Sequence, residues 1–212
     1  MEQNPELALA WQFIESTGTH LFLTGKAGTG KTTFLRKLKQ ESPKRMVVVP
    51  PTGIAAINAG GVTIHSFFQI PFAPYVPESS FSTNGKASYR FRFGKEKINI
   101  IRSMDLLVID EISMVRADLL DAVDEMRRYR DPYKPFGGVQ LLMIGDLQQV
   151  APVVKDEEWQ MLSKYYDTPY FFSSRALKQT EYCTIELKTV YRQNDGDFLE
   201  LLNRIRENHC DP

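Results

Sequence analysis

A glycine-rich run near the N-terminus has the residue types that hold nucleotide phosphates. Gly25-Lys-Ala-Gly-Thr-Gly-Lys31-Thr32 matches G-x-x-x-x-G-K-T. Glycines let the backbone curl so that its N–H groups face phosphate oxygens, while the lysine contacts the β- and γ-phosphates and the threonine hydroxyl ligates Mg²⁺. The run follows a predicted strand, HLFLT, and begins a predicted helix, TTFLRKL, which is the context of a true P-loop. We predict an ATP site at Gly25, Ala27, Gly28, Thr29, Gly30, Lys31, Thr32 and Thr33.

Polar residues after three later predicted strands complete this chemistry. Asp110 and Glu111 follow the apolar run LLVI. Asp110 is predicted to hold Mg²⁺ with Thr32, and Glu111 to orient and deprotonate the attacking water, which favours hydrolysis over transfer to a second substrate. After the run LLMI, Gln149 can hydrogen-bond the γ-phosphate or that water. Arg192, after the last strand, is either a solvated side chain or a group that stabilises transition-state charge.

Apolar runs alternating with amphipathic ones predict the elements that position these residues. The pattern is typical of an α/β fold whose mostly parallel sheet has helices on both faces. Runs such as MVVV and LLVI are apolar throughout, as in strands covered on both sides. The predicted strands are 20–24, 46–50, 106–109, 140–144 and 184–187, and the predicted helices are 5–16, 31–40, 117–130 and 197–207.

One segment interrupts the alternation. Residues 69–97 contain three prolines and an Asn84–Gly85 turn signal, followed by alternating aromatic and basic residues. An inserted β-hairpin is the simplest interpretation. The predicted domains are therefore an α/β domain that carries the phosphate site, residues 1–68 and 98–212, and a small hairpin subdomain, residues 69–97.

The four motifs, with PPTGIAAINAGGVTIHSFF between the first two, resemble those of superfamily-one 5′-to-3′ DNA helicases, most closely the Pif type. The resemblance covers about Leu21 to Gln193. It implies a RecA-like P-loop NTPase fold, Mg-ATP hydrolysis coupled to movement on single-stranded DNA, and unwinding of forked or structured DNA. It assigns the ATPase roles to Lys31, Thr32, Asp110, Glu111, Gln149 and Arg192. It assigns contacts with the single strand to Thr52, Gly53, Thr63, His65 and Ser66.

The chemistry of the intervening stretch agrees with that assignment. Hydroxyl side chains and the backbone N–H groups of Gly60 and Gly61 suit phosphates, and His65 with Phe67 or Phe68 can stack on bases. Alternatively, the two phenylalanines belong to the core and His65 caps a helix facing the P-loop. In the hairpin, Arg90 and Arg92 are the DNA-binding candidates, whereas Tyr89, Phe91 and Phe93 either pack the hairpin or contact DNA.

Two departures from the family pattern are visible. The third motif reads GDLQQVAPV where the family has GD-x-x-QLPPV, although Gln149 keeps its register. The glutamine that reads adenine is not in its usual place, and Gln3, with Asn4 beside it, is the nearest candidate. Since a translocating helicase needs two RecA-like domains, we expect a second one beyond Pro212 and, for these 212 residues alone, weak nucleotide binding and little or no unwinding.

Composition sets wider bounds. Net charge is zero, so only the local basic surplus between Lys86 and Arg102 favours a phosphate backbone. No run is long enough to span a membrane, and the N-terminus lacks a signal peptide's basic start. Cys183 and Cys210 are predicted to be reduced thiols. We expect a monomer that is cytoplasmic if bacterial, and nuclear or mitochondrial if eukaryotic.

Two other functions remain open from the sequence. One is a P-loop NTPase that acts on a small molecule or as a nucleotide switch, although the Asp110–Glu111 pair argues against a kinase. The other is a non-catalytic single-strand-binding module that uses the basic hairpin alone, for which Lys31 would be dispensable.

Overall fold

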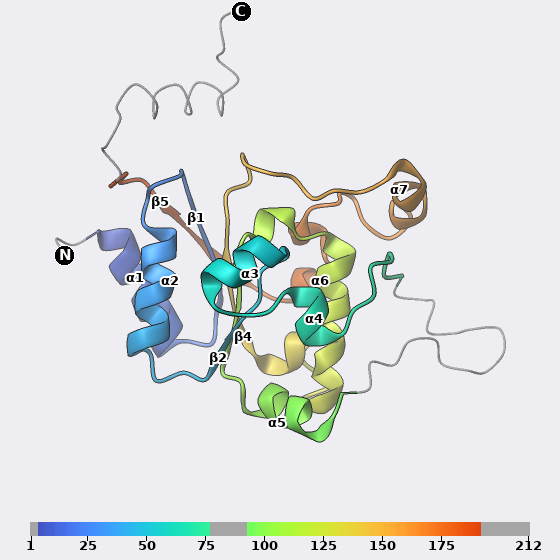
Figure 1. Ribbon diagram of the computed structural model, residues 1–212, viewed down its shortest axis with the longest axis horizontal. Coiled ribbons are helices and arrows are strands. Elements are labelled where there is room, and N and C mark those ends of the chain that lie inside the picture. The colour runs from blue at the N-terminus through green and yellow to red at the C-terminus, as the bar shows by residue number, and fades with distance from the viewer. Residues whose placement is uncertain (1–3, 77–92, 192–212) are drawn as a thin grey trace, which may run out of the picture.

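A five-stranded sheet forms the centre of the computed structural model, which describes residues 4–76 and 93–191 (Figure 1). Every pairing is parallel, in the order β2-β3-β4-β1-β5. The strands are β1 (His20–Gly25), β2 (Met46–Val48), β3 (Leu106–Ile109), β4 (Gln140–Ile144) and β5 (Tyr182–Leu187). The predicted parallel α/β architecture is confirmed. β2 ends earlier than predicted because Pro50, which has no N–H, cannot continue the ladder after Val49 donates to Val108.

Helices cover both faces of the sheet (Figure 1). Helices α1 and α2 pack on one face, and α4, α5 and α6 pack on the other. The α-helices are α1 (Pro5–Ser16), α2 (Lys31–Glu41), α3 (Gly53–Ala59), α4 (Ile64–Phe68), α5 (Lys95–Ser103), α6 (Ala117–Asp124) and α7 (Asp156–Leu162). The 3₁₀ helices are η1 (Ile112–Met114), η2 (Glu125–Tyr129), η3 (Pro135–Gly138), η4 (Phe171–Ser173) and η5 (Leu177–Gln179).

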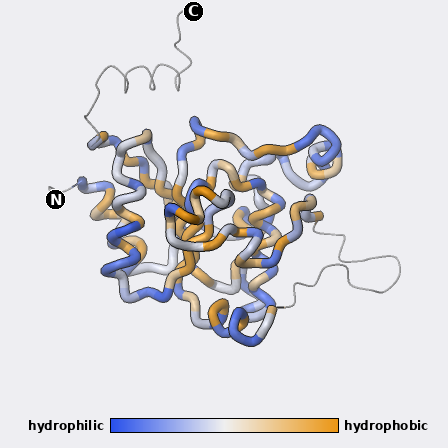
Figure 2. Tube along the Cα trace, in the orientation of Figure 1, coloured by the Kyte–Doolittle hydropathy of each residue, from blue (hydrophilic) through white to orange (hydrophobic). Residues whose placement is uncertain are grey.

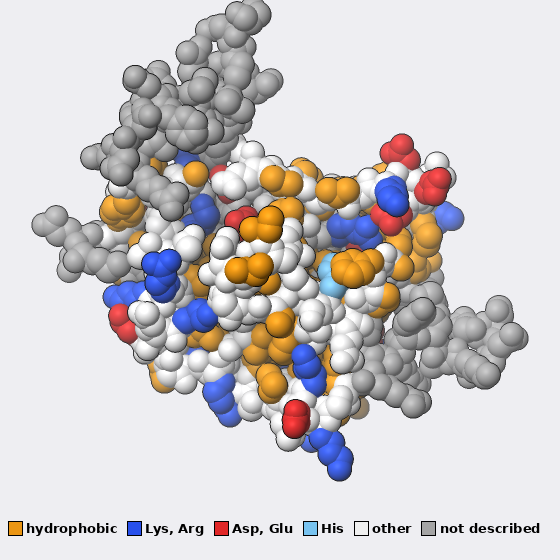
Figure 3. Space-filling model, in the orientation of Figure 1, with side chains coloured by type: hydrophobic (Ala, Val, Ile, Leu, Met, Phe, Trp, Pro, Cys, Tyr) orange, Lys and Arg blue, Asp and Glu red, His pale blue; other side chains and the backbone are white. Residues whose placement is uncertain are grey.

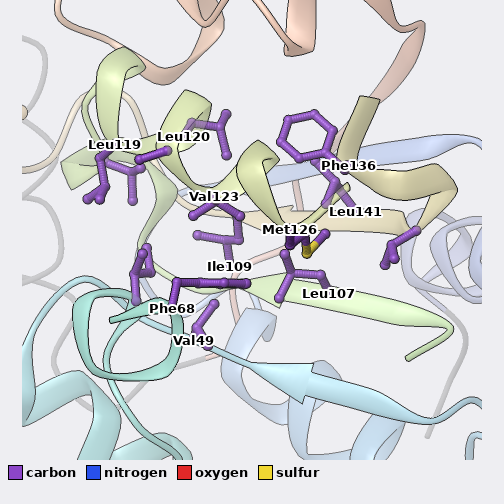
Figure 4. Packing of buried hydrophobic residues seen from close by; sticks show 14 of the residues in the cluster. Val49, Phe68, Leu107, Ile109, Leu119, Leu120, Val123, Met126, Phe136 and Leu141 are labelled. Carbon is purple, nitrogen blue, oxygen red and sulfur yellow. The ribbon is translucent and has the colours of Figure 1, made fainter. Parts of the chain in front are cut away.

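Successive side chains of β3 point to opposite faces of the sheet, and the core accordingly has two layers. Leu106 and Val108 pack with α1 and α2, whereas Leu107 and Ile109 pack with α4 and α6. Figure 4 shows the second layer, where side chains from α6 meet those of β3 and β4. Hydrophobic residues accordingly concentrate in the central strands (Figure 2). Burial on both faces explains why these strands are apolar throughout.

The helix predicted for 117–130 is only partly α-helical. α6 ends at Asp124 and continues as η2 to Tyr129. Tertiary contacts override the helical periodicity here, because the Asp124 carboxylate accepts the N–H of Phe136 and Arg130 donates to three backbone carbonyls at the end of α5. The helix predicted at 197–207 lies outside the described residues.

The stretch after β2, for which the sequence predicted no helix, forms two short helices. Thr52 begins α3 and Thr63 begins α4, since each hydroxyl oxygen accepts a backbone N–H of the first turn. The N–H groups of Gly60 and Gly61 donate to carbonyls of α3 at its C-terminus. They are therefore engaged within the helix end and not offered to a phosphate, contrary to the prediction.

The two described ends of the 69–97 segment pack onto the α/β domain. Ile70 and Phe93 are buried in its core, and α5 begins at Lys95. Tyr75 donates its N–H to Asp118 and its hydroxyl to Glu125, so the segment leaves the core along α6. The Asn84–Gly85 turn, Tyr89 and Phe91 lie outside the described residues, and the domain boundaries stay a prediction.

Two further observations concern the sequence expectations. Within residues 4–76 and 93–191, no helix is long and apolar enough to cross a membrane. Cys183 is a free thiol, and Cys210 lies outside the described part of the chain.

Candidate nucleotide and nucleic-acid sites

The parallel sheet brings the predicted phosphate chemistry to one edge. Gly25 ends β1, Asp110 follows β3, and Gly145 follows β4. Leu23 pairs with Ile144, and Ile109 pairs with Met143, so the three strands end at nearly the same level. The carboxyl edge of such a sheet is where ligands bind in open α/β folds.

Backbone conformation shapes the glycine-rich loop. Gly28 and Gly30 have φ values of 80° and 95°, in the left-handed region that glycine tolerates. At Gly25, an added Cβ would lie 2.7 Å from the carbonyl oxygen of Leu187, so β5 packs too closely for any side chain. Gly30 precedes α2 without a side-chain cap, which leaves the first N–H groups of that helix facing the loop. Anions bind readily at such a helix start.

Lys31 lies close enough to Asp110 and Glu111 for its charge to affect both carboxylates. The Lys31 ammonium donates to the carbonyl oxygens of Gly25 (2.5 Å) and Lys26 (3.0 Å). Its charge also acts on Asp110 and Glu111, where it opposes the effect of burial on each pKa. The described fold thus gathers the cation and both carboxylates around the loop.

The pKa of each carboxylate is raised, mainly because burial disfavours the charged form. For Glu111 the neighbouring Asp110 charge raises the pKa further, and Asp146 adds to this. Glu111 also has a left-handed backbone (φ 54°), an uncommon conformation for a residue with a side chain, and its N–H donates to the Asp110 carboxylate at 3.0 Å. Such strain concentrates at functional sites.

Gln149 reaches this edge through Asp146. Its amide donates to the Asp146 carboxylate at 3.2 Å, while its own side chain is exposed. Gly145 holds β4 against η1, because an added Cβ would lie 2.9 Å from Ile112. Gln149 and Glu111 are therefore carried by two segments in direct contact.

Thr32 and Asp110 suit a magnesium ion in the presence of phosphates. The Thr32 side chain is exposed in the first turn of α2, and Asp110 is partly buried beside Lys31. Mg²⁺ prefers a few protein oxygens supplemented by water and phosphate oxygens. Among residues 4–76 and 93–191, no three His, Cys, Asp or Glu side chains are grouped to hold a metal. Thr32 and Asp110 therefore fit a magnesium site whose other ligands are water and phosphate oxygens.

Of the residues predicted to contact adenine or to stabilise the transition state, only Asn4 lies in the described part of the chain. Asn4 accepts the N–H groups of Glu6 and Leu7 and so caps α1, while its buried amide nitrogen has no hydrogen-bond partner. Tyr191 donates its N–H to Gly28, which brings the end of the described chain against the loop. Gln3, Arg192, Arg90 and Arg92 lie outside the described residues.

The predicted nucleic-acid residues lie at the starts of α3 and α4. Thr52 and Thr63 each accept one backbone N–H, which leaves the hydroxyl proton to donate to another acceptor. Gly53 and Ser66 are exposed beside them. These helix starts offer hydroxyl and N–H donors of the kind that hold a phosphate backbone.

Phe67 and Phe68 do not stack on bases, contrary to one interpretation of the sequence. Both are buried in the core beneath α4, and the Lys97 ammonium lies 4.0 Å from the Phe67 ring centroid. His65 does not cap its helix, since Thr63 does. Instead, its imidazole stacks on Phe72, with ring centroids 4.4 Å apart and an interplanar angle of 19°.

A cavity of about 260 Å³ opens beside this ring pair. Thr52, His65, Phe72, Arg116 and Asp118 contribute to its wall. On the face drawn in Figure 3, hydrophobic side chains gather over α3 and beside α4, which is the neighbourhood of the cavity.

Arg116, which lines the cavity, is held by two carboxylates. Its guanidinium donates to Asp118 at 2.8 and 2.7 Å and to Glu158 of α7 at 2.9 Å. Asp118 in turn accepts the Tyr75 N–H. Burial, and next the Arg116 charge, lowers the pKa of His65, so its imidazole is neutral near pH 7.

The family model described as PIF1-like helicase matches residues 6–211. The chain belongs to the PIF1-like helicase family. The yeast ATP-dependent DNA helicase PIF1 (Saccharomyces cerevisiae) is 35% identical over 93% of this chain, and the human one is 37% identical over 91%. The chain spans only 22% and 28% of those two relatives.

Solved PIF1-like helicases share the fold. A Bacteroides Pif1 helicase in complex with ADP–AlF₃ and single-stranded DNA is 42% identical, with a TM-score of 0.90 over 100% of this chain and 48% of that one. The Candida albicans Pif1 helicase is 33% identical, with a TM-score of 0.73 over 97% of this chain and 44% of that one.

Sequence reasoning missed two residues of this PIF1-like chain. Phe72 is 89% exposed on the surface near α4, and Arg116 links α6 to α7. The prolines at 71 and 74 were a usable signal for Phe72, because an aromatic residue between them lies outside any regular element. Nothing in the spacing indicates the partners of Arg116, which come from distant segments.

Proposed function

We propose that this chain is the first motor domain of an ATP-dependent 5′-to-3′ DNA helicase that binds and hydrolyses Mg-ATP while it moves on single-stranded DNA. The observation that carries the proposal is the gathering of Lys31, Asp110 and Glu111 at one edge of the sheet around an uncapped helix start. The names of the relatives, which are ATP-dependent DNA helicases, support the same activity. The direction of movement rests on the family resemblance.

ATP binding follows from the loop. Backbone N–H groups at the start of α2 would hold the phosphates, and the Lys31 ammonium would exchange its carbonyl partners for phosphate oxygens. Asn4, which caps α1, and Gln3, which precedes it in the sequence, are the candidates for contact with the adenine base. Thr32 and Asp110 would hold Mg²⁺, which supplies charge neutralisation on the phosphates.

Hydrolysis requires a base for the attacking water and a residue that hydrogen-bonds the γ-phosphate or that water. Glu111 is proposed to accept the proton of the attacking water, and its raised pKa makes it a better acceptor near neutral pH. Gln149 is proposed to hydrogen-bond the γ-phosphate or the water, since its contact with Asp146 keeps it at this edge. Arg192 is proposed to stabilise the transition-state charge.

The nucleic-acid part of the proposal rests on α3 and α4. Thr52, Gly53, Thr63 and Ser66 would hold the phosphates of a single strand, with His65 nearby and Arg90 and Arg92 as further contacts. Forked or structured DNA is the proposed substrate, and a second RecA-like domain of the same parent chain and a monomeric state are further proposals. We place the activity in the bacterial cytoplasm or in the eukaryotic nucleus or mitochondrion.

Nucleotide titration with matched variants tests the ATP site. Binding of a fluorescent ATP analogue with Mg²⁺ is expected for the unaltered chain and for Glu111→Gln, and it should be abolished in Lys31→Ala. Lys37→Ala is the control, because that lysine lies on the same helix in an exposed pair with Glu41.

Phosphate release is measured in parallel, and Glu111→Gln should lower it about 10²- to 10⁴-fold. Equal nucleotide affinity of Lys31→Ala and Lys37→Ala would contradict the assignment of the site.

A further inference from the structure

Phe72 exposes a flat apolar surface beside α4, at the cavity that Thr52 also lines. Its side chain is 89% exposed, and one face of the ring is taken by His65 at a centroid distance of 4.4 Å. Full burial of a phenylalanine is worth about 1.5–3 kcal/mol, which this position forgoes. His65 thus covers one face of the ring and leaves the other toward solvent.

The cavity beside Phe72 offers one group suited to a phosphate and one suited to a base. Thr52 lines the same cavity as Phe72 and keeps a hydroxyl proton for a phosphate oxygen. Phe72 supplies an aromatic face, the contact that single-strand-binding proteins use for a base without reading its identity. The Arg116 guanidinium, also at the cavity, is bound by two carboxylates, so it does not provide an unpaired charge there.

We propose that the outward face of Phe72 stacks on a base of a single-stranded nucleic acid, with His65 as the support behind the ring. This inference rests on the proposed function and adds a base-contact residue to it. In this arrangement His65 is a positioning residue that contacts Phe72 and not the base. The neutral state of the imidazole suits that task, because a charged ring would have to be desolvated under the phenylalanine.

Affinity for labelled oligo-dT, measured by fluorescence anisotropy at low salt, tests the contact. Phe72→Ala is expected to raise the Kd roughly 5- to 150-fold, the range for the loss of one base–aromatic stack. Phe72→Tyr should bind like the unaltered chain, since it keeps the ring. Tyr133→Ala is the matched control, because Tyr133 is an aromatic residue of similar exposure, 93%, and should leave the Kd unchanged.

Two further readouts separate stacking from a general structural effect. An oligonucleotide of abasic sites should bind the unaltered chain and Phe72→Ala with the same Kd. In Phe72→Trp, oligo-dT should quench the added indole fluorescence, whereas it should not in Tyr133→Trp. Adding His65→Ala to Phe72→Trp should reduce the quenching, and His65→Ala with Phe72→Ala should weaken binding no more than the stronger single change.

The outcomes distinguish this inference from the proposed function. If the unaltered chain binds oligo-dT and Phe72→Ala binds equally well, the inference is wrong and the proposed function stands. If Phe72→Ala weakens binding to the abasic strand as much as to oligo-dT, the ring is structural and the inference is also wrong. If the unaltered chain binds no single strand, both are overturned.

Discussion

Arg116→Met is predicted to destabilise the domain by about 3–5 kcal/mol, because it removes one partner of a buried ion pair. The Asp118 carboxylate is 2% exposed and accepts two hydrogen bonds from Arg116. After the substitution, the one donor left to Asp118 among residues 4–76 and 93–191 is the Tyr75 N–H, at 2.9 Å. Methionine preserves an unbranched apolar stem, so the loss reports the charge rather than packing.

Arg45→Met provides a control with the same geometry at the surface. Arg45 donates to both oxygens of Asp105 at 2.8 Å and lowers the pKa of that carboxyl to about 2. The two side chains are 66% and 37% exposed, and solvent screens such a pair. We expect no measurable loss of stability from this substitution.

Urea unfolding followed by circular dichroism measures the difference. At an m-value of about 2 kcal/mol/M, Arg116→Met should lower the midpoint by about 1.5–2.5 M, and Arg45→Met should leave it in place. Arg116→Met combined with Asp118→Leu should regain much of the loss, because the buried Asp118 charge is then removed as well, while Glu158, the other partner of Arg116, is 25% exposed and stays in contact with water. Equal midpoints for Arg116→Met and Arg45→Met would refute the reasoning.

Three further predictions concern pH and packing. The unaltered chain should lose up to about 3 kcal/mol of stability as pH falls from 6.5 to 4, because buried His20 has a pKa of about 4 and stays neutral while the same histidine in the unfolded chain takes up a proton. In urea titrations at each pH, His20→Asn should remove this part of the pH dependence of the unfolding free energy. Gly145→Ala should lower the free energy of unfolding by about 1–3 kcal/mol and slow ATP hydrolysis, because the added Cβ would push η1 and the adjoining Glu111. The control Gly18→Ala, at a position with open space around it, should change neither the unfolding midpoint nor phosphate release. Because the pKa of Glu111 is raised, hydrolysis should fall on the acidic side at a pH above the ordinary value for glutamate, and a pH–rate profile at the ordinary value would contradict its role as base.

Local patterns in the sequence were sufficient to predict the sheet and to bring the candidate phosphate-binding residues to one edge of it. Strands such as Leu106–Ile109 are apolar because both faces are covered, and this leaves a run that is easily recognised. The glycine-rich loop is likewise local, since its conformation depends on Gly28 and Gly30 themselves. The predicted parallel α/β sheet was confirmed for these reasons.

The remaining features depend on contacts between distant residues. Helices α3 and α4 have seven and five residues, too short for periodicity to separate them from a loop. The burial of Phe67 and the exposure of Phe72 are set by the packing of α4 on the core, which the residue types alone do not reveal. For the same reason the N–H groups of Gly60 and Gly61 were assigned to phosphate when they complete the end of α3.

The most direct test of the central claim is the anisotropy of labelled oligo-dT with this chain at low salt, with and without an ATP transition-state analogue and Mg²⁺. A duplex of equal length serves as the competitor. The account predicts a lower Kd for the single strand than for the duplex, weakening with salt, and a change in that Kd when the analogue binds. Equal affinity for both forms, or a Kd insensitive to an analogue that demonstrably binds, would contradict a nucleotide-coupled grip on single-stranded DNA.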